Sequence, residues 1–429
     1  MVGSVLRSLA SAISTTLGAS VVGWADRQAR QRRLRRPPLA ELLVALLATR
    51  LSAIAYVATR SELQAALKAP ALAADIPGGL QLLHFRQQRP EQSKSREMHP
   101  QWFLCRGAMP KWWDRHETSS PPAEGDGTGS NGEPAGGVDG LRSGAGSALY
   151  LVFRGTSSTS DVIRDLCMEP EEFRGQRFHG GFLRGVREDP DLLPTLRRAL
   201  KDGDCERLFV FGHSLGGSLA MTLATSGLVP TSSAGRDAAP PVTVVAVGAP
   251  PVLQVSVARG RPPSDRDGKD GPVGDTARAE MGAGGSSSKR PGAWDEGDAD
   301  ADAPSSAPVP PGTYLLVVND CDVVPRLLGS PMPVAIAALL QEACVTNHGQ
   351  AVMQRHVELL ETMQGFEHPP GTRAIFLREG DAKAVPSRDR SAVLHLHEAL
   401  SPSLLDAHYP DKYERSLETA AALAEAFEG

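Results

Sequence analysis

The segment Gly212-His213-Ser214-Leu215-Gly216 holds a serine hydroxyl where it can act as a nucleophile. An apolar run precedes it at residues 208–211, and an apolar segment follows at 217–224. A serine at a tight turn between a buried strand and a helix sits in a strained backbone, with its hydroxyl presented above the sheet. The flanking glycines let the strand and the helix pass closely without a Cβ clash. A glycine-rich turn that carries a serine by chance is the ordinary alternative in a chain with 43 glycines, but the strand and helix signals favour a nucleophile.

Two aspartates are candidates for the acid that orients the base of such a serine. In α/β-hydrolases the partners follow the serine in the order acid, then histidine. Asp322 and its competitor Asp320 both come soon after the apolar run 314–318. Loops at the carboxyl ends of parallel strands are where such sheets carry function. An aspartate that only caps this loop is an ordinary alternative, and composition alone does not separate the two residues.

Three histidines follow, and their positions predict different roles. His395 and His397 are two residues apart in a strand pattern, the first within the predicted strand 392–396 and the second directly after it, so they face the same side and are typical of packing or surface residues. His408 lies in a loop before the last predicted helix, at 413–427. A loop histidine is most often a polar surface residue, but its place after the serine and the acid favours His408 as the base.

Acyl transfer at a serine also needs two hydrogen-bond donors for the oxyanion. One is expected from the backbone N–H of Leu215, the residue after the nucleophile. The segment after the strand-like run 147–153 contains Arg154-Gly155-Thr156, and the backbone N–H of Thr156 is the candidate for the second donor. A simple glycine turn is the alternative there. Loss of one such donor typically costs about 2.7–4 kcal/mol of transition-state stabilisation.

The bulk composition bounds the class of protein. The chain has 429 residues, of which 41% are hydrophobic, so a sizeable core is available. A formal net charge of −5 implies no broad basic surface and argues against nucleic acid as a partner. The 5 cysteines are widely spaced without a Cys-x-x-Cys pair, so neither a disulfide framework nor a zinc site is expected. We expect no metal or organic cofactor, and a reducing intracellular compartment.

The first 40 residues form a basic leader with 7 arginines and a single acid, Asp26. This composition is typical of an organelle transit peptide, and a poorly ordered basic tail is an equal alternative. We therefore expect a cytoplasmic or organellar location. The next apolar segment, 39–57, is interrupted by Glu41 and Arg50, which predicts a core-facing helix rather than a transmembrane one.

Strand and helix signals alternate along the rest of the chain. Most strand signals are continuous apolar runs, as expected for strands covered on both faces. The pattern predicts an α/β-hydrolase fold, a mostly parallel central sheet flanked by helices, with an N-terminal helical appendage packed on it. The predicted strands lie at 147–153, 208–211, 242–247, 314–318, 374–377 and 392–396, and the helices at 192–200, after Ser214, within 333–356 and at 413–427.

Composition divides the chain into segments. Two low-complexity segments, 117–147 and 254–312, bury too little apolar surface to offset the entropy of ordering them, so we expect disordered insertions. The predicted parts are a basic leader or disordered tail at 1–38, an N-terminal helical segment and entry to the catalytic domain at 39–116, the linker at 117–147, the first part of the α/β-hydrolase domain at 148–253, the insertion at 254–312 and the second part at 313–429.

At these motifs the chain resembles the class 3 lipases, the fungal-type triacylglycerol lipase family, and within it the sn-1-specific diacylglycerol lipases. The matching segments keep the family's order from about residue 102 to about residue 417. They are Val152-Phe153-Arg154-Gly155-Thr156 with Asp161 and Asp165, Phe178-His179-Gly180-Gly181-Phe182, Gly212 to Gly217, Asp322-Val323-Val324-Pro325-Arg326-Leu327, and Leu400 to Leu405 leading to His408 and Pro410.

The resemblance implies a serine lipase that cleaves acylglycerol esters through an acyl-serine intermediate. It selects Asp322 over Asp320 and implies a lid at about residues 157–166. Alternatives are a phospholipase A1 or galactolipase of the same family, or a non-catalytic signalling scaffold, against which the filled triad argues. The residues and roles implied are Ser214 as nucleophile, His408 as general base and then acid, Asp322 as its orienter, and Thr156 and Leu215 as the oxyanion hole.

The chain departs from the animal diacylglycerol lipases, which carry several transmembrane helices before the catalytic domain. This difference favours a protein that meets lipid peripherally, at a membrane or lipid-droplet interface. The insertion 254–312 lies where diacylglycerol lipases carry a regulatory insertion, which suggests gating or phosphorylation at serines 286–288, although a neutral spacer is the favoured interpretation. Trp102, Phe103, Trp112 and Trp113 could touch a membrane, but core packing is the more ordinary use of such side chains.

Overall fold

A computed structural model of the chain describes the following residues: 35–57, 59–87, 100–113, 146–155, 169–202, 205–229, 240–254, 312–319, 322, 324–327, 365–378, 381–385 and 406–428. Several sequence predictions fall outside these ranges. They are the leader before residue 35, Thr156, the lid segment 157–166, nearly all of the two insertions, Asp320, the helical region 333–356, and His395 and His397 with their strand at 392–396.

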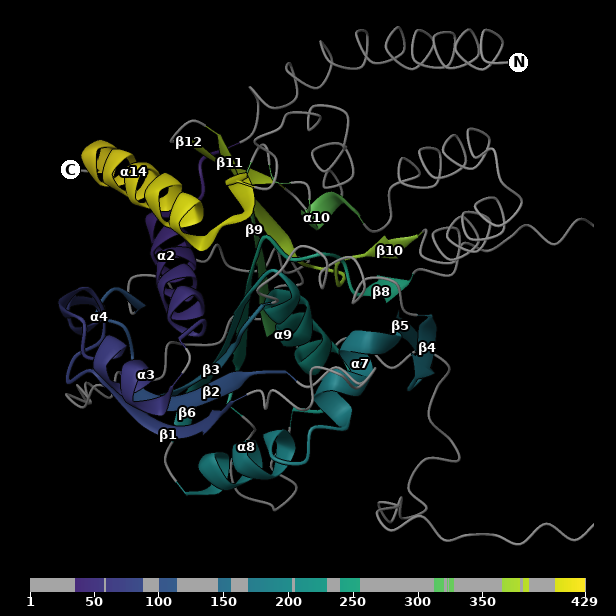
Figure 1. Ribbon diagram of the computed structural model, residues 1–429. Helices are drawn as coiled ribbons and strands as arrows, with labels where there is room; N and C mark the ends of the chain where they lie inside the picture. Colours follow the sequence, from purple (N-terminus) through teal and green to yellow (C-terminus); the bar gives the residue numbers. More distant parts are fainter. Residues whose placement is uncertain are drawn as a thin grey trace, which may run out of the picture.

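A central sheet of 8 strands organises the described residues, in the order β1-β2-β3-β6-β7-β9-β11-β12 (Figure 1). The five consecutive strands from β3 to β11 are parallel to their neighbours, and antiparallel pairs close both edges. This mostly parallel sheet confirms the predicted fold class. The strands are β1 (Leu80–Arg86), β2 (Trp102–Ala108), β3 (Ser147–Phe153), β6 (Cys205–His213), β7 (Val242–Val247), β9 (Gly312–Asn319), β11 (Arg373–Arg378) and β12 (Asp381–Val385).

The predicted strands agree with the observed ones wherever the structure describes them. Those at 147–153 and 242–247 have the bounds of β3 and β7. Those at 208–211, 314–318 and 374–377 lie inside β6, β9 and β11. The edge strands β1 and β12, and β2 next to β1, were not predicted. No side chain of β1 is fully buried, and polar residues interrupt its sequence, so it lacks the apolar run that marks a central strand.

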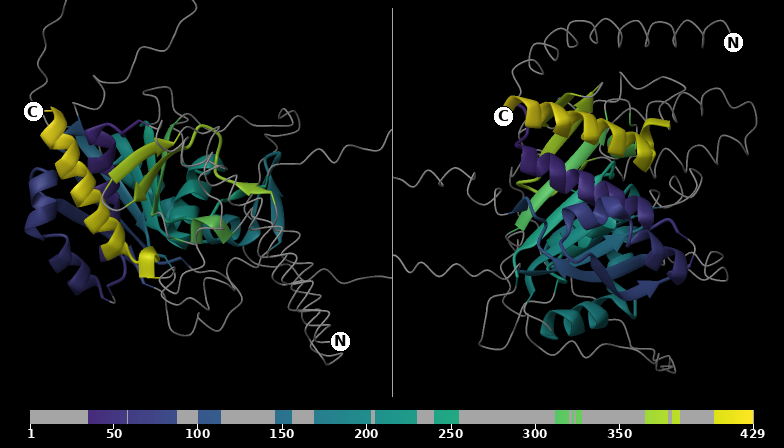
Figure 2. Two further views of the ribbon diagram at one scale, coloured as in Figure 1. Left: turned by 90° about the horizontal axis from the view of Figure 1, so that it is seen from above. Right: turned by 90° about the vertical axis from the view of Figure 1, so that its left-hand side faces the viewer.

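Helices cover both faces of the sheet (Figure 2). On one side α2 and α14 lie next to each other, while α7, α8 and α9 lie on the other side (Figure 1). The helices are α2 (Leu39–Ile54), α3 (Arg60–Ala66), α4 (Pro70–Asp75), α7 (Gly180–Arg187), α8 (Leu192–Lys201), α9 (Leu215–Thr225), α10 (Val324–Leu327), a 3₁₀ turn (Asp406–His408) and α14 (Pro410–Glu428).

A second, smaller sheet of 4 strands extends beyond α7, in the order β10-β8-β5-β4. Strands β4 and β5 form a hairpin, whereas the β5–β8 and β8–β10 antiparallel pairs join segments that are far apart in the chain. Its strands are β4 (Pro170–Phe173), β5 (Gln176–His179), β8 (Leu253–Gln254) and β10 (Phe366–Glu367).

The alternation of side chains along the central strands builds two cores. In β3, Leu149 and Leu151 pack with α7, α8 and α9, whereas Tyr150 and Val152 pack with α2 and α14. Successive residues of a strand point to opposite faces, so one strand supplies both cores. The continuous apolar runs of β3, β6 and β7 are therefore required by the fold, because each of their faces is covered.

Helix α2 is the core-facing helix predicted at the N-terminal end. Its leucines 47 and 51 have no exposed surface, and Arg50 forms ion pairs with Asp75, Glu414 and Glu418, two of them on α14. Near the outer ends of these helices, the Arg36 guanidinium lies 4.4 Å from the centre of the Phe427 ring. Within the described ranges, no helix combines the length and apolar character needed to cross a bilayer.

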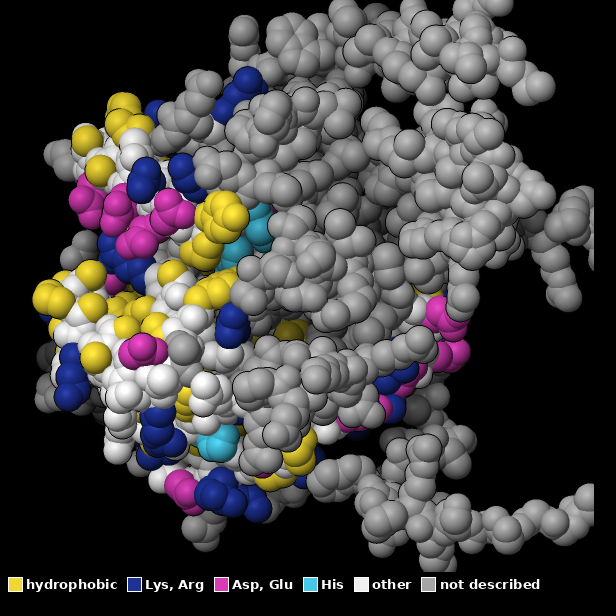
Figure 3. All heavy atoms as spheres, viewed as in Figure 1, with side chains coloured by type: hydrophobic (Ala, Val, Ile, Leu, Met, Phe, Trp, Pro, Cys, Tyr) yellow, Lys and Arg dark blue, Asp and Glu magenta, His cyan; other side chains and the backbone are white. Residues whose placement is uncertain are grey.

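The four aromatic residues considered above as membrane contacts lie inside the protein. Trp102 and Phe103 are 1% and 0% exposed, and Trp112 and Trp113 are 8% and 4% exposed. They therefore pack in the core. On the face shown in Figure 3, basic and acidic side chains interleave over the part of the surface that the structure describes.

We expect truncation of α2 in its buried stripe to destabilise the whole domain. Leu47→Ala removes a side chain with no exposed surface and should lower the free energy of unfolding by about 2–5 kcal/mol. Leu423→Ala on α14 is the matched control, because Leu423 is 41% exposed, and it should change stability by no more than about 0.5 kcal/mol. Denaturant unfolding of both variants measures the difference, and equal losses would contradict a core role for α2.

Candidate active site

The nucleophile turn has the geometry that its sequence predicts. Strand β6 ends at His213, helix α9 begins at Leu215, and Ser214 between them has φ 57° and ψ −130°. A positive φ in a residue with a side chain costs on the order of 1–3 kcal/mol, and it persists only where the surrounding structure imposes it. Here the Ser214 N–H donates to the carbonyl of Val247 at 2.8 Å, which holds the turn against the neighbouring strand β7.

Glycines on both sides of the serine allow the turn to close. A Cβ on Gly212 would lie 2.2 Å from the Gly216 carbonyl oxygen, and one on Gly216 would lie 2.4 Å from the Phe153 carbonyl oxygen. Both contacts are with backbone atoms, which cannot move aside. The close approach of strand and helix inferred from the motif is thus observed, and it sets the Ser214 side chain beside the end of β3.

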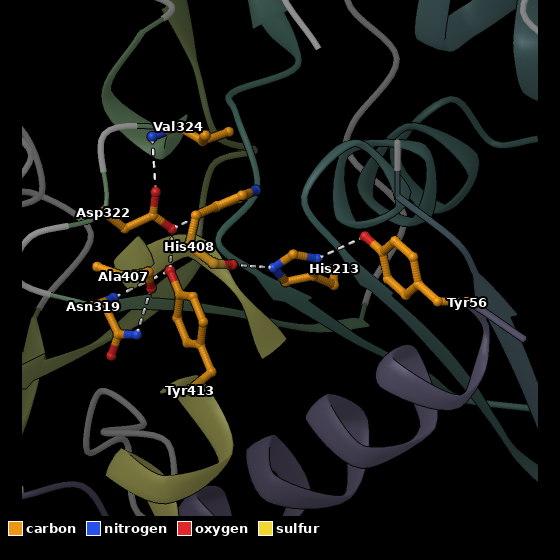
Figure 4. A network of polar contacts seen from close by, with 8 residues as sticks. All are labelled: Tyr56, His213, Asn319, Asp322, Val324, Ala407, His408 and Tyr413. Carbon is orange, nitrogen blue, oxygen red and sulfur yellow. Dashed lines mark hydrogen bonds and ion pairs between the residues drawn. The ribbon is translucent and has the colours of Figure 1, made fainter. Parts of the chain in front are cut away.

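The structure brings Asp322 and His408 together, although 86 residues separate them (Figure 4). The His408 Nδ1 atom lies 2.8 Å from Asp322 Oδ2. The carboxyl group has no exposed surface and accepts two further hydrogen bonds, from the Val324 N–H at 2.8 Å and from the Tyr413 hydroxyl. A buried carboxyl group is tolerated when donors surround it, and all three of these donors lie in the last third of the chain.

This contact determines which nitrogen of His408 is available for chemistry. A carboxylate only accepts hydrogen bonds, so Nδ1–H donates to Asp322 and Nε2 carries the free lone pair. Both His408 Nε2 and Ser214 Oγ are buried, and neither has a hydrogen-bond partner among the described residues. These are the two atoms between which a proton must move in acyl transfer, and such contacts often tighten only when substrate binds.

Two residues that the sequence analysis did not assign hold this pair in place. Tyr413, in the first turn of α14, donates to Asp322 and accepts from the Asn319 N–H at 3.2 Å. The Asn319 side chain donates to the Ala407 carbonyl oxygen at 2.9 Å, next to His408. Asn319 ends β9 and Tyr413 lies five residues after the histidine. Their positions beside the predicted acid and base were the only signal in the sequence that could have identified them.

Of the two predicted oxyanion donors, only Leu215 lies within the described residues. Leu215 occupies the first position of α9, where a backbone N–H has no intrahelical acceptor and is free to bind an anion. Thr156 lies outside the described residues, but its neighbour Gly155 is described. A Cβ on Gly155 would lie 3.0 Å from Ser214 Cβ, so the segment after β3 reaches the nucleophile.

His213, the residue before the nucleophile, is a further buried histidine. Its Nε2 lies 2.6 Å from the carbonyl oxygen of His408, and its Nδ1 lies 2.9 Å from the hydroxyl of Tyr56 (Figure 4). Burial lowers the pKa of His213 well below its usual value, and the nearby His408 lowers it further. The ring is therefore neutral near pH 7. In the sequence, only its place in the segment 212–216 marks His213.

The surroundings of His408 include exposed apolar surface. Tyr409 directly follows His408 and is 57% exposed. Figure 3 shows hydrophobic side chains next to histidine side chains on this face. Among the residues that the structure describes, no three His, Cys, Asp or Glu side chains are grouped so as to hold a metal ion.

Comparison with known proteins identifies the segment around the nucleophile. Residues 150–260 match the family model described as Lipase (class 3). A lipase of Rhizopus niveus is 34% identical over 85 residues, which is 19% of this chain and 22% of that protein. A lipase of Rhizomucor miehei is 36% identical over 80 residues, which is 18% of this chain and 22% of that protein. The chain thus spans about a fifth of the length of these curated relatives.

Solved structures give a broader but weaker likeness. The structure of lipase II from Rhizopus niveus aligns over 82% of this chain and 86% of that one, with 14% identity and a TM-score of 0.39. The likeness to lipases therefore depends on the sequence matches. The family model covers the end of β3, the turn at Ser214 and β7. The segment 150–260 is thus similar to the class 3 lipase family.

Proposed function

We propose that this protein is a serine carboxylic ester hydrolase, a lipase, with Ser214, His408 and Asp322 as its catalytic triad. The observation that carries the proposal is the hydrogen bond between His408 and Asp322 beside a strained serine turn. This bond orients the imidazole and stabilises the imidazolium that forms in the reaction. The family model that matches residues 150–260, around Ser214, and the relatives named lipase support the same chemistry.

Acylation starts with attack of Ser214 Oγ on the ester carbonyl carbon, while His408 Nε2 takes the hydroxyl proton. The carbonyl oxygen becomes an oxyanion, which accepts hydrogen bonds from the backbone N–H groups of Leu215 and Thr156. As the intermediate collapses, His408 returns the proton to the leaving alcohol oxygen and the ester bond breaks. The acyl group is then attached to Ser214.

Deacylation repeats the same steps with water as the nucleophile. His408 Nε2 takes a proton from water, whose oxygen attacks the acyl carbon, and the second oxyanion forms on the same donors. Collapse breaks the bond to Ser214 Oγ, and the proton on His408 passes to that oxygen. The products are a free fatty acid and the regenerated serine. His408 thus acts as a base and then as an acid in each half of the cycle.

We propose acylglycerols as the substrates, with diacylglycerol first, because the motifs around Asp322 and His408 resemble those of diacylglycerol lipases. Such substrates are poorly soluble, so the protein must meet them at a lipid–water interface. The exposed Tyr409 beside the base supports this arrangement, because an aromatic ring with a polar tip suits such a boundary. We therefore propose a peripheral contact with membrane or lipid-droplet surfaces.

A fluorophosphonate probe tests the nucleophile. We expect the wild-type protein to be labelled covalently and Ser214→Ala to remain unlabelled, because the probe phosphonylates an activated serine oxygen. Ser226→Ala, at the end of the same helix, is the matched control and should label like the wild type. Mass spectrometry of the labelled peptide gives the site. A wild-type protein that does not react would favour the scaffold alternative.

The acid is tested by Asp322→Asn. The amide is similar in size but can hold the wrong imidazole tautomer, so kcat for ester hydrolysis should fall by roughly 10⁴-fold, as for a triad aspartate. Asp411→Asn changes a carboxylate whose side chain is 55% exposed, and its kcat should stay at the wild-type level. If the two variants retain the same activity, Asp322 is not the orienting acid.

A panel of lipid vesicles and emulsions tests the substrate class. We expect fatty acid release from diacylglycerol to exceed release from phosphatidylcholine or galactolipid, and Ser214→Ala should abolish all of it. Chromatography of the released fatty acids gives the rates. Fatty acid release from phosphatidylcholine or galactolipid, without release from diacylglycerol, would contradict the proposed substrate. The protein would then act as a phospholipase A1 or a galactolipase.

A further inference from the structure

His213 links two segments whose relative position matters for the proposed reaction. The ring is 3% exposed and contacts the carbonyl oxygen of His408 on one side and the hydroxyl of Tyr56 on the other. The centres of the His213 and His408 rings are 4.6 Å apart. The imidazole thus fills the space between the end of the nucleophile strand, the loop that carries the base, and the chain just after α2.

The direction of both hydrogen bonds follows from their partners. A carbonyl oxygen only accepts, so His213 Nε2–H donates to the backbone of His408. A neutral imidazole then has a lone pair on Nδ1, which accepts from the Tyr56 hydroxyl. The buried environment favours this neutral form, because charging the ring would remove the acceptor and leave a buried cation. Each nitrogen therefore has one defined partner.

Tyr56 is itself held on several sides. Its hydroxyl lies against the backbone of Gly155, the residue before the proposed oxyanion donor Thr156: a Cβ on Gly155 would lie 2.5 Å from the Tyr56 oxygen. The Gln101 side chain donates to the carbonyls of Ala55 and Val57, each at 3.2 Å, and so fixes the backbone around Tyr56. One phenolic oxygen therefore joins the oxyanion segment to His213.

We propose that His213 is a positioning residue of the esterase site, whose two hydrogen bonds set the base loop at His408 relative to the nucleophile turn and the oxyanion segment. This inference rests on the proposed function, since it concerns the same reaction. The bond to His408 is made to its backbone, so a shift of that carbonyl carries the catalytic imidazole with it. A misplacement of about 1 Å at a reacting group can cost on the order of 10²-fold in rate.

The test compares two replacements of His213. His213→Phe keeps a flat ring but loses both polar contacts, whereas His213→Gln keeps a donor near the position of Nε2. We expect His213→Phe to lower kcat and the rate of fluorophosphonate labelling by about 10- to 100-fold, with KM within about threefold of the wild type. His213→Gln should recover most of the lost rate, which a purely space-filling role would not explain.

Tyr56→Phe provides an independent arm of the test. This change removes the hydroxyl that donates a hydrogen bond to His213 Nδ1, so kcat should fall, as in His213→Phe. The double variant Tyr56→Phe/His213→Phe should lose less than the two single losses combined, because both changes break the same Tyr56–His213 contact. Fully additive losses would contradict the coupling between the two residues.

Nitrogen NMR of the His213 ring gives a readout that needs neither catalytic activity nor a replacement of His213. In the Ser214→Ala protein we expect a neutral ring with a protonated Nε2 and an unprotonated Nδ1 at pH 7. A protonated Nδ1 overturns the inference, as does a folded His213→Phe variant that labels at the wild-type rate. A wild-type protein that does not label at Ser214 overturns the proposed function itself, which distinguishes the two failures.

Discussion

The burial of the Asp322 carboxyl group imposes the main constraint on this site. A carboxyl group without exposed surface destabilises the fold unless donors satisfy its oxygens. Its donors are the N–H of Val324, the ring of His408 and the hydroxyl of Tyr413. His408 lies just before the last helix and Tyr413 lies in its first turn, so α14 must pack against the end of β9. The same packing that satisfies the buried carboxyl group therefore brings the proposed acid and base together.

The N-terminal helix α2 also holds α14 in this position. Arg50 on α2 pairs with Glu414 and Glu418 on α14, and the leucines of α2 fill one face of the sheet. Exposed ion pairs contribute little, so apolar burial supplies most of the stability of this contact. Because Tyr56 follows directly after α2, the helix that closes the core also delivers a hydroxyl to the site. Stability and function thus depend on the same interface.

The central strands and the nucleophile turn were predictable because their signals are local. Strand β7 is an unbroken apolar run, and the glycines around Ser214 mark a turn that only small residues permit. The pairing of Asp322 with His408 followed from chain order and a family resemblance, and its distance required the structure. The roles of Tyr413 and Tyr56 could not be predicted, because they depend on contacts between segments far apart in sequence. Edge strand β1 was missed because it is only partly buried.

The contact between Arg36 and Phe427 places the two ends of the described structure side by side. It brings the first and last described segments within a few ångströms of each other, on the outer side of α2 and α14. A short peptide tether could join these ends without distorting either helix, and new ends could then be opened in a surface connection elsewhere. Tension applied to the two ends would load the packing between α2 and α14 together with the hydrogen bond from the Ala384 N–H to the Arg35 carbonyl, which ties the first segment to edge strand β12.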